Sequence, residues 1–291
     1  MSSLQLPLQG GRRRGVVRTR LFWAFLVLSI LIGIVTLGAL LVQVFVKGVQ
    51  FLDLVLLLEP PSQDPQIAGA RPAILATIYL GVLLIALTVP IGVGTAIYLE
   101  EYAAKERWYN RLLEADIQNL AAVPSIVYGI LGLAFLVRGL GLGRVLLAGA
   151  MILTLLVLPT MIIAAREAIR AVPDSIRQGA YALGATKWQV TARQVLPAAA
   201  PGIATGAILA LSRALGETAP LLLVGALTYV AFDPTPLGAF TALPVQIYQW
   251  IAQPQEEFRT LAASAIILLL AILLTLNAFA IWLRNRYGRK W

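Results

Sequence analysis

The chain has 291 residues, of which 59% are hydrophobic and only 13% are charged. A soluble domain carries roughly 25% charged and about 45–50% apolar residues, so this composition excludes a disordered chain, a fibrous protein and an ordinary soluble enzyme, and indicates an integral membrane protein. The net charge of +9 would suit a nucleic-acid binder, but in a membrane protein excess Lys and Arg normally lie in cytoplasmic loops. Because the chain has neither Cys nor His, it offers no disulfide, no thiolate metal site and no Ser-His or Cys-His dyad. We therefore expect no metal, no cofactor and no enzymatic activity of its own.

Six apolar stretches are long enough to cross a membrane as helices, since the ~30 Å hydrocarbon core needs about 20 residues. All lack Lys, Arg, Asp and Glu, except that the fifth contains Arg213 and Glu217. In chain order they are Leu21–Val46, Pro72–Leu99, Ile117–Val137, Val145–Ala165, Gln194–Phe232 and Thr260–Leu283. The strands of a membrane barrel would be alternating segments of about ten residues. We therefore predict an all-α protein with six transmembrane helices.

The first stretch follows a cluster of five arginines and so resembles a signal peptide. Its apolar run is much longer than the 7–15 residues of a cleaved signal, and no clear small-residue cleavage site follows it. We predict an uncleaved anchor helix. The arginines are Arg12, Arg13, Arg14, Arg18 and Arg20.

The Lys and Arg residues outside the six stretches divide unequally between the two sides of the membrane. Seventeen fall on the side that holds both termini, and five fall on the other. Since cytoplasmic loops carry the excess of basic residues, we predict that both termini are cytoplasmic.

The third stretch contains Pro124, Ser125 and Gly129. Small residues of this kind either pack helices closely together or line a transport pathway. The sequence favours neither alternative, and in the second one Ser125 would be the pathway residue.

The cytoplasmic segment Arg166–Arg193 is much longer than an ordinary connector between helices. Pro173, Asp174 and Ser175 form a helix-start signal, and Gly184 is a helix-stop signal. We predict a short amphipathic helix over Ser175–Leu183, a turn at Gly184 and a second helix that begins near Thr186 or Lys187. A solvated connector is the alternative, but a structured loop of this length favours docking of a partner.

Arg213 and Glu217 are the charged residues of the fifth stretch, and their i,i+4 spacing would put them on one helix face. If that helix begins near Gly202, Arg213 lies about 16 Å along it, close to the middle of the membrane. The pair is either a structural ion pair or a site that meets an anionic substrate. The order Arg before Glu is the poorer one for an intrahelical pair, and Gly216 and Pro220 would weaken the helix as in transport pathways.

Several of these motifs resemble the permeases of ABC importers. Gly179–Trp188, followed by Leu196-Pro197 and Pro201-Gly202, is similar to the EAA loop of that superfamily, although Gln178, Gly179 and Gln194 replace the Glu, first Ala and Ile of its pattern. Arg213–Leu222 resembles the phosphate-specific permeases, and its Thr-Ala-Pro-Leu-Leu ending is similar to their A subunit (PstA-like). The segments Ala96–Ala103 and Val123–Gly129 also match, and the similarity runs from about Arg71 to the C-terminus.

The resemblance implies a MetI-like permease core over residues 71–291, with five transmembrane helices and an EAA coupling loop at about 166–200. Residues 1–70 would form a cytoplasmic tail, a first transmembrane helix and an extracytoplasmic loop. The protein would be a multi-pass protein of a bacterial or archaeal inner membrane. Its pathway residues would be Arg213, Glu217, Thr218 and Ser125. Its coupling residues would be Gln178, Gly179, Ala180, Tyr181, Ala182, Leu183 and Gly184.

The resemblance also implies partners. A second permease subunit (PstC-like) would complete the pore for inorganic phosphate, with a dimer of ATPase subunits (PstB-like) below it and an extracytoplasmic phosphate-binding protein (PstS-like) outside. The chain contains no Gly-x-x-x-x-Gly-Lys-[Ser/Thr] loop, so ATP hydrolysis would belong to the separate ATPase.

Three alternatives remain at this point. A permease for sulfate, molybdate or another small oxyanion could use Arg213 in the same way. An intramembrane enzyme would need a nucleophile, base or metal cluster for which the sequence offers few residues. A non-transporting scaffold would not require a charge in the middle of the membrane.

Overall fold

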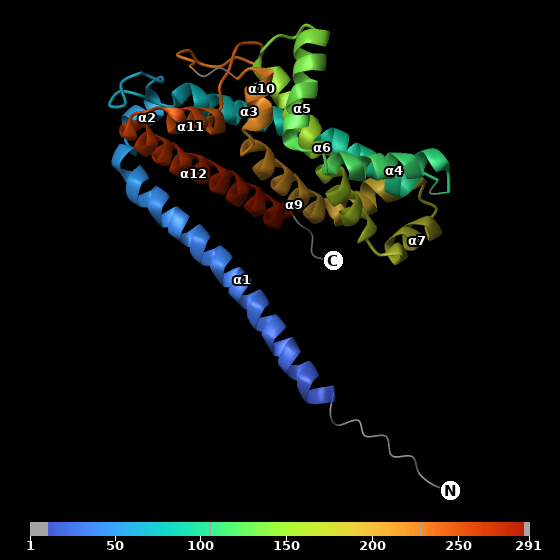
Figure 1. Cartoon of the computed structure of the whole chain (residues 1–291). Helices are drawn as coiled ribbons and strands as arrows, with labels where there is room; N and C mark the ends of the chain where they lie inside the picture. The colour runs from blue at the N-terminus through green and yellow to red at the C-terminus, as the bar shows by residue number, and fades with distance from the viewer. Residues whose placement is uncertain (1–10, 105, 227–228, 288–291) are drawn as a thin grey trace.

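The computed structural model describes residues 11–104, 106–226 and 229–287, and every element in these ranges is helical (Figure 1). The helices in chain order are α1 (Gly11–Gly48), α2 (Leu54–Leu58), α3 (Arg71–Ile97), α4 (Trp108–Ala121), α5 (Ser125–Gly132), α6 (Leu146–Arg170), α7 (Asp174–Ala182), α8 (Lys187–Val190), α9 (Leu196–Leu215), α10 (Ala219–Val224), α11 (Leu243–Ala252) and α12 (Glu256–Tyr287). A 3₁₀ turn, η1 (Val49–Phe51), follows α1. Three π-helical segments extend α3, extend α5 and join α8 to α9: η2 (Tyr98–Tyr102), η3 (Leu133–Gly139) and η4 (Thr191–Val195).

Five helical runs in the described residues are long and apolar enough to cross a membrane. They coincide with the first, second, fourth, fifth and sixth predicted stretches and confirm the all-α membrane fold. The third prediction, a single helix over Ile117–Val137, is wrong in detail. The chain breaks between α4 and α5 and turns by 103°, so this pair forms a sixth crossing only if the bent pair counts as one span. The reason is Pro124, which disfavours helical geometry at the residue before it.

The fifth predicted stretch, Gln194–Phe232, is also not one helix. Its helical run begins earlier, at Lys187, and ends at Leu215, after which the chain continues through the short helix α10 into a segment without helix. Leu227 and Thr228, within this stretch, lie outside the described residues. The helix therefore does not begin near Gly202, the start that was assumed in placing Arg213, because Pro197 and Pro201 lie inside the run without ending it.

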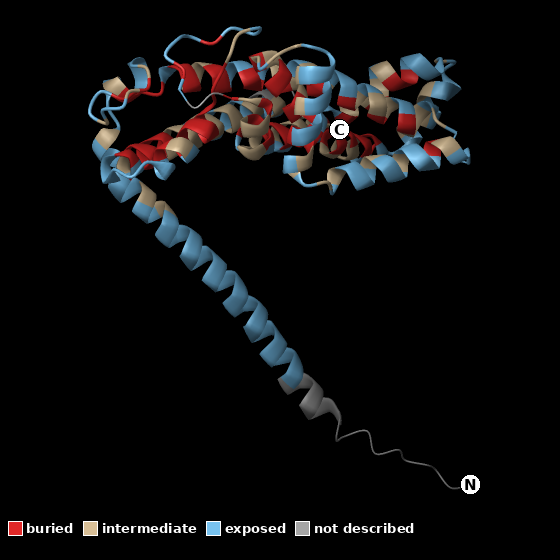
Figure 2. Ribbon diagram, turned by 45° about the horizontal axis from the view of Figure 1, so that its top comes forward, coloured by how far each residue is buried: buried red, intermediate tan, exposed pale blue. Residues whose placement is uncertain are grey.

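Helix α6 forms the centre of the fold. Two thirds of its most apolar stretch is buried, against one third for α3 and for the α8–α9 run (Figure 2). Small residues let these helices approach closely: a methyl group on Gly92 of α3 would meet Met161 of α6, and one on Gly206 of α9 would meet Ala164. Contacts of this kind drive helix association in a membrane, where lipid is as apolar as the side chains.

Helix α1 is the exception to this packing. Every side chain from Leu21 to Leu40 is exposed, and α1 approaches the other helices only near its C-terminal end, beside α12 (Figure 2). There the hydroxyl of Ser264 donates a hydrogen bond of 2.5 Å to the carbonyl oxygen of Gly48. A methyl group on Gly48 would lie 2.7 Å from the backbone of Ala263, so the two helices touch through glycine. The predicted anchor helix is thus a long apolar helix that stands apart from the core.

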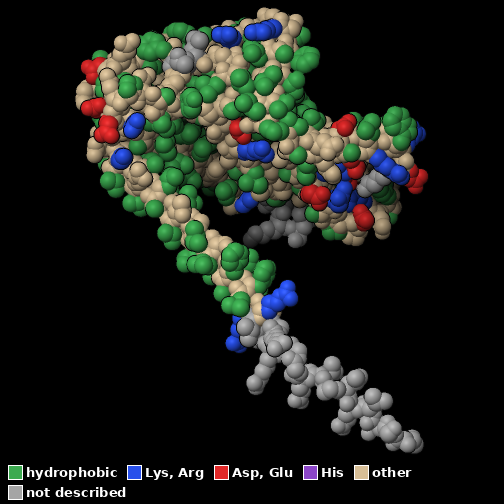
Figure 3. Space-filling view, in the orientation of Figure 1, with side chains coloured by type: hydrophobic (Ala, Val, Ile, Leu, Met, Phe, Trp, Pro, Cys, Tyr) green, Lys and Arg blue, Asp and Glu red, His purple; other side chains and the backbone are tan. Residues whose placement is uncertain are grey.

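The two ends of the molecule differ in structure. At one end α4 and α7 lie together, and at the other α2, α11 and the start of α12 form a second, smaller apolar core (Figure 1). This smaller core includes Leu56, Leu243, Trp250 and Phe258. Acidic side chains gather mainly at these two ends (Figure 3).

Candidate functional site

Arg213 and Glu217 lie at the break between α9 and α10. Arg213 is in the last turn of α9, about 39 Å along the run from Lys187 at 1.5 Å per residue, and Glu217 lies after the helix has ended at Gly216. The Arg213 Nε and the Glu217 Oε1 are 3.8 Å apart, an ion-pair distance longer than a hydrogen bond. The Arg213 side chain is 46% exposed and that of Glu217 is 22% exposed. The predicted pairing is present, but as a loose pair at a helix terminus and not on the face of a continuous helix.

The position of Arg213 suits a cation. A helix C-terminus carries a partial negative charge and free carbonyl groups, so an arginine in the last turn is favoured there. The carbonyl oxygen of Arg213 accepts a bond from the N–H of Gly216, and that of Ala214 accepts one from the N–H of Glu217. The loose ion pair and the exposed guanidinium leave its remaining N–H donors open to an anion.

Helix α5 packs directly against this break. A methyl group on Gly129 would lie 2.8 Å from the Cα of Pro220 and 2.9 Å from Leu223, so the close approach of α5 to α10 requires glycine here. One residue earlier, Tyr128 donates a hydrogen bond of 2.8 Å to the carbonyl oxygen of Leu120. The segments 123–129 and 213–222, which are about 90 residues apart in the sequence, thus pack against each other.

Ser125 and Thr218 lie at the edges of this structure. Ser125 is the first residue of α5 and is half-buried, one helical turn before Tyr128 and Gly129. Thr218 is the residue before α10, also half-buried, and its carbonyl oxygen accepts from the N–H of Leu222. Of the two alternatives that the sequence left open for 123–129, the structure shows close packing at Gly129. The role of Ser125 as a pathway residue stays a prediction.

The predicted docking loop has the expected secondary structure. Helix α7 covers Asp174–Ala182, one residue from the predicted Ser175–Leu183, and Gly184 has a φ of +80°, the left-handed conformation that ends a helix. The next helix begins at Lys187, after a capping box in which the Thr186 hydroxyl accepts from the N–H of Gln189 and the Gln189 side chain accepts from that of Thr186. Both sequence signals are therefore confirmed.

One face of this loop is partly buried and the other is open. Ile176 and Ala180 pack against the main core, whereas Gln178, Gly179, Ala182 and Gly184 are exposed. The exposed apolar side chains of this loop are Tyr181, Leu183, which is 91% exposed, and Trp188. Exposed apolar groups clustered beside polar ones mark an interaction surface.

A set of ion pairs that the sequence did not predict fixes this loop to the core. Arg177 of α7 donates to Glu101 of η2 at 2.9 Å, and also to the carbonyl oxygens of Val172 and Ile169 at the end of α6. The side chain of Glu101 is only 6% exposed. Arg177 thus joins three elements, α7, the end of α6 and the extension of α3.

Glu100, next to Glu101, forms a second junction. It accepts from Arg166 at 2.9 Å and from Arg170 at 2.7 Å, and Arg166 in turn pairs with Glu114 of α4 at 2.8 Å. Arg166 and Glu100 are both buried, so each needs its partner to offset the loss of hydration. The sequence held one signal of these ion pairs, the adjacent Glu100 and Glu101 directly after the second apolar stretch. Two neighbouring carboxylates at a helix end indicate that basic side chains lie nearby in the fold.

Comparison with known proteins gives one family model and several similar chains. The model of the binding-protein-dependent transport system inner membrane component matches residues 88–290. The phosphate transport system permease protein PstA 1 of Mycobacterium tuberculosis (strain CDC 1551 / Oshkosh) is 35% identical over 217 residues, which cover 74% of this chain and 70% of that protein. PstA 2 of Mycobacterium bovis is 32% identical over 284 residues, covering 94% of this chain and 92% of that protein.

Two solved structures have a similar fold. A bacterial alginate ABC transporter, in complex with a periplasmic protein that carries an alginate pentasaccharide, matches 95% of this chain and 98% of its own with a TM-score of 0.68 and 18% identity. The MetNI methionine ABC transporter in an inward-facing conformation matches 76% of this chain and 96% of its own with a TM-score of 0.59 and 19% identity. At this identity the likeness concerns the fold alone.

Proposed function

Because this chain belongs to the family of binding-protein-dependent transport system inner membrane components, a family of multi-pass inner-membrane permeases and not of enzymes, we propose that it is the permease subunit of an ATP-driven importer of inorganic phosphate. The observation that carries the proposal is the exposed guanidinium of Arg213 at the break between α9 and α10, in a chain 32–35% identical to relatives named phosphate permeases. The alternative of a sulfate or molybdate permease is not favoured, since the relatives compared above are named for phosphate.

In this proposal Arg213 meets the phosphate in transit. Phosphate at neutral pH is an anion and does not cross an apolar core unaided. A guanidinium stays protonated and presents a planar fork that matches two phosphate oxygens. The half-exposed side chain at the end of α9 can reach such an anion without breaking a tight internal pair, since its distance to Glu217 is 3.8 Å.

Glu217 has the complementary role. An unopposed arginine would hold the anion too tightly for release, and a carboxylate two residues beyond the end of α9 lowers that affinity. Hydrogen phosphate keeps a P–OH group that can donate a hydrogen bond to a carboxylate. Sulfate at neutral pH has no such proton, so the carboxylate would repel it. Ser125 and Thr218 supply hydroxyls at the edges of the same break and complete the proposed pathway set.

The loop at about 166–200 is the proposed contact with the ATPase. Support comes from its defined helix–turn–helix geometry and from its exposed face, which carries Tyr181 and Leu183. Its coupling residues run from Gln178 through Gly179, Ala180, Tyr181, Ala182 and Leu183 to Gly184. Since this loop must face the ATP-containing compartment, we place it and both termini in the cytoplasm, and the end with α2 and α11 outside.

We propose that the partner in the membrane is a second, different permease chain, and that residues 71–291 form the part that pairs with it. The ATPase dimer would bind below and a phosphate-binding protein would dock outside. Cysteine cross-linking in native membranes tests the pairing, because the chain has no Cys of its own. Recovery of homodimers alone would contradict a heterodimeric pore.

Phosphate uptake by the reconstituted complex tests the function directly. The full set of subunits in proteoliposomes, with ATP enclosed and the binding protein outside, should accumulate labelled phosphate and fail to accumulate labelled sulfate. ATP-dependent sulfate uptake under these conditions would favour the alternative, a permease for sulfate or another small oxyanion. A complex that accumulates neither anion, although it is intact and hydrolyses ATP, would contradict the proposal.

A further inference from the structure

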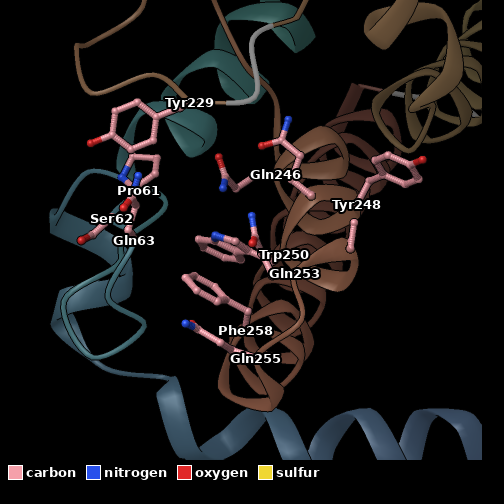
Figure 4. A pocket seen from close by; sticks show the side chains of 12 residues that line it. Pro61, Ser62, Gln63, Tyr229, Gln246, Tyr248, Trp250, Gln253, Gln255 and Phe258 are labelled. Carbon is pink, nitrogen blue, oxygen red and sulfur yellow. The ribbon is translucent and has the colours of Figure 1, made fainter.

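A cavity of about 630 Å³ (Figure 4) lies beside α2 and α11, at the end of the molecule opposite α7 (Figure 1). Its walls come from the loop after α2, the segment around Tyr229, helix α11 and the first turn of α12. A volume of this size is within the range of specific binding pockets. The candidate pathway described above uses none of its residues.

The lining is polar but uncharged. It contains five glutamines and four aromatic side chains, and none of its twelve residues is Asp, Glu, Lys or Arg. Side-chain amides both donate and accept hydrogen bonds, and aromatic rings offer apolar faces, so these walls suit a ligand with amide-like polarity and some apolar surface. A phosphate ion would find no positive charge here.

One glutamine of the cavity is buried with an unused acceptor. Gln246 of α11 is 2% exposed, and its Oε1 has no hydrogen-bond partner. One turn later Gln249 has a buried Nε2 that also lacks a partner. A buried acceptor and a buried donor left unpaired each cost free energy, and small side-chain rotations toward the cavity would let a bound group satisfy both. A peptide group, with one N–H and one C=O, is the natural complement of such a pair.

The stretches that flank the cavity are acidic. Residues 59–64 and 253–259 contain Glu59, Asp64, Glu256 and Glu257 against the single base Arg259, and all five are exposed. Figure 3 shows acidic side chains gathered at this end. A partner that docks here is therefore favoured if basic residues flank the part that enters.

We propose that this cavity receives an uncharged loop of the extracytoplasmic binding protein, with Lys or Arg on either side of the loop tip. The inference rests on the proposed function, because it is the family's dependence on a binding protein that supplies the partner, and because the cavity lies at the outer end only in the proposed orientation. The loop backbone pairs with the amides of Gln246 and Gln249, its apolar atoms contact the aromatic rings, and the basic flanks meet the acidic stretches.

A matched pair of tryptophan substitutions tests the cavity. Gln63 is exposed and lines it, whereas Gln66 is exposed in the same loop and does not. In the assembled complex, Gln63→Trp should fill the cavity and weaken binding of the phosphate-loaded binding protein about tenfold, which corresponds to about 1.4 kcal/mol. Gln66→Trp should change the Kd by less than about twofold, and both variants should keep the basal ATPase rate. Equal Kd values for Gln63→Trp and the unmodified complex would overturn the cavity as the docking site.

Two further experiments test the acidic stretches that flank the cavity and the identity of the loop that enters it. The double variant Glu256→Gln/Glu257→Gln should weaken binding at low salt, and the difference should vanish at high salt because screening removes it. A photo-cross-linking residue at position 63 should capture an uncharged peptide of the binding protein with a basic residue close by. Capture of lipid, of the second permease chain, or saturable binding of a neutral sugar in the cavity would overturn the assignment.

These outcomes separate the two proposals. The binding protein could stimulate ATP hydrolysis by the unmodified complex and yet bind the Gln63→Trp complex with the same Kd. That result would support the proposed function and overturn the docking site. If no binding protein engages the unmodified complex in any nucleotide state, the proposed function falls and takes the docking site with it.

Discussion

The Oε1 of Glu101, in the extension of α3, lies 2.9 Å from the Nη2 of Arg177 on α7, although 76 positions separate the two residues in the sequence. The same guanidinium donates to the carbonyl oxygens of Ile169, in the last turn of α6, and of Val172, two residues after α6 ends. Any displacement of α7 therefore pulls on the ends of two membrane-spanning helices through one side chain. We infer that Arg177 is a positioning residue of the coupling loop.

Arg177→Met should lower phosphate uptake per ATP hydrolysed by more than about tenfold, because it leaves Glu101 buried without this partner and frees two carbonyls. Glu101→Gln should have a smaller effect, since Arg177 keeps its carbonyl acceptors. Parallel measurement of uptake and ATP hydrolysis in proteoliposomes checks this. Arg170→Gln is the control. It also removes an arginine, but one that is half-exposed and pairs with the neighbouring Glu100. An uptake-to-hydrolysis ratio that is unchanged in Arg177→Met would refute the positioning role.

Arg213→Gln should abolish phosphate uptake while the complex still assembles. Arg213→Lys should keep part of the activity, because it retains the charge but not the two-pronged donor geometry. Uptake into vesicles, with the subunits verified by co-purification, is the measurement. Arg138→Gln removes the same charge from an exposed arginine at the end of η3 and should stay within about twofold of normal uptake. Normal transport by Arg213→Gln would reduce the pair with Glu217 to a structural one.

Gly184→Val should uncouple ATP hydrolysis from uptake without removing the protein from the membrane. Its φ of +80° is a conformation that a β-branched residue adopts only with strain, of about 1–2 kcal/mol. Gly143 provides a matched control, since its φ is +77°, its surroundings are equally open, and it lies in the loop between η3 and α6. Gly143→Val carries the same backbone strain and should leave coupling intact. If both variants behave alike, the turn at Gly184 has no special role in coupling.

Gly129→Ala should lower both the Tm of the purified complex and its uptake. The added methyl group would lie 2.8 Å from the Cα of Pro220, so α5 and α10 must separate beside Arg213. Gly94→Ala in α3 adds the same group where nothing lies within 4 Å, and it should keep or raise the Tm, since alanine favours a helix interior over glycine by about 1 kcal/mol. A thermal unfolding assay compares the Tm of both variants with that of the unmodified complex. An unchanged Tm in Gly129→Ala would show that the interface of α5 with α10 tolerates a methyl group.

The apolar stretches predicted most of the fold because hydrophobic length is a local property of the sequence. Composition does not show where such a stretch breaks: the third breaks at Pro124, whereas the fifth continues as a helix through Pro197 and Pro201 and breaks only after Leu215. The signals around α7 were local as well, so Gly184 and Thr186 were predicted in the right roles. Helix α11 was not predicted, because ten residues are too few to stand out as a membrane span.

The parts of the site that escaped prediction depend on long-range contacts. Arg177 was one of five basic residues in a cytoplasmic segment, and nothing local pairs it with Glu101. The spacing of Arg213 and Glu217 indicated a pair, and Gly216 and Pro220 indicated a weakened helix. The sequence did not show that the helix ends at Leu215 or that α5 packs against this break. The four glutamines at 246, 249, 253 and 255 carried no motif, and only the fold gathers them with Gln63 around one cavity.

The isolation of α1 has a consequence for biosynthesis. Its contact at Gly48 is made with Ser264, 216 residues later in the chain, and its side chains from Leu21 to Leu40 touch no buried surface of the core. In the part of the chain that the structure describes, the main helical neighbour of α1 is α12, which is synthesised last. Lipid or a neighbouring protein must therefore cover the apolar surface of α1 throughout. We therefore expect α1 to insert early and to join the other helices of this chain only once α12 has been inserted.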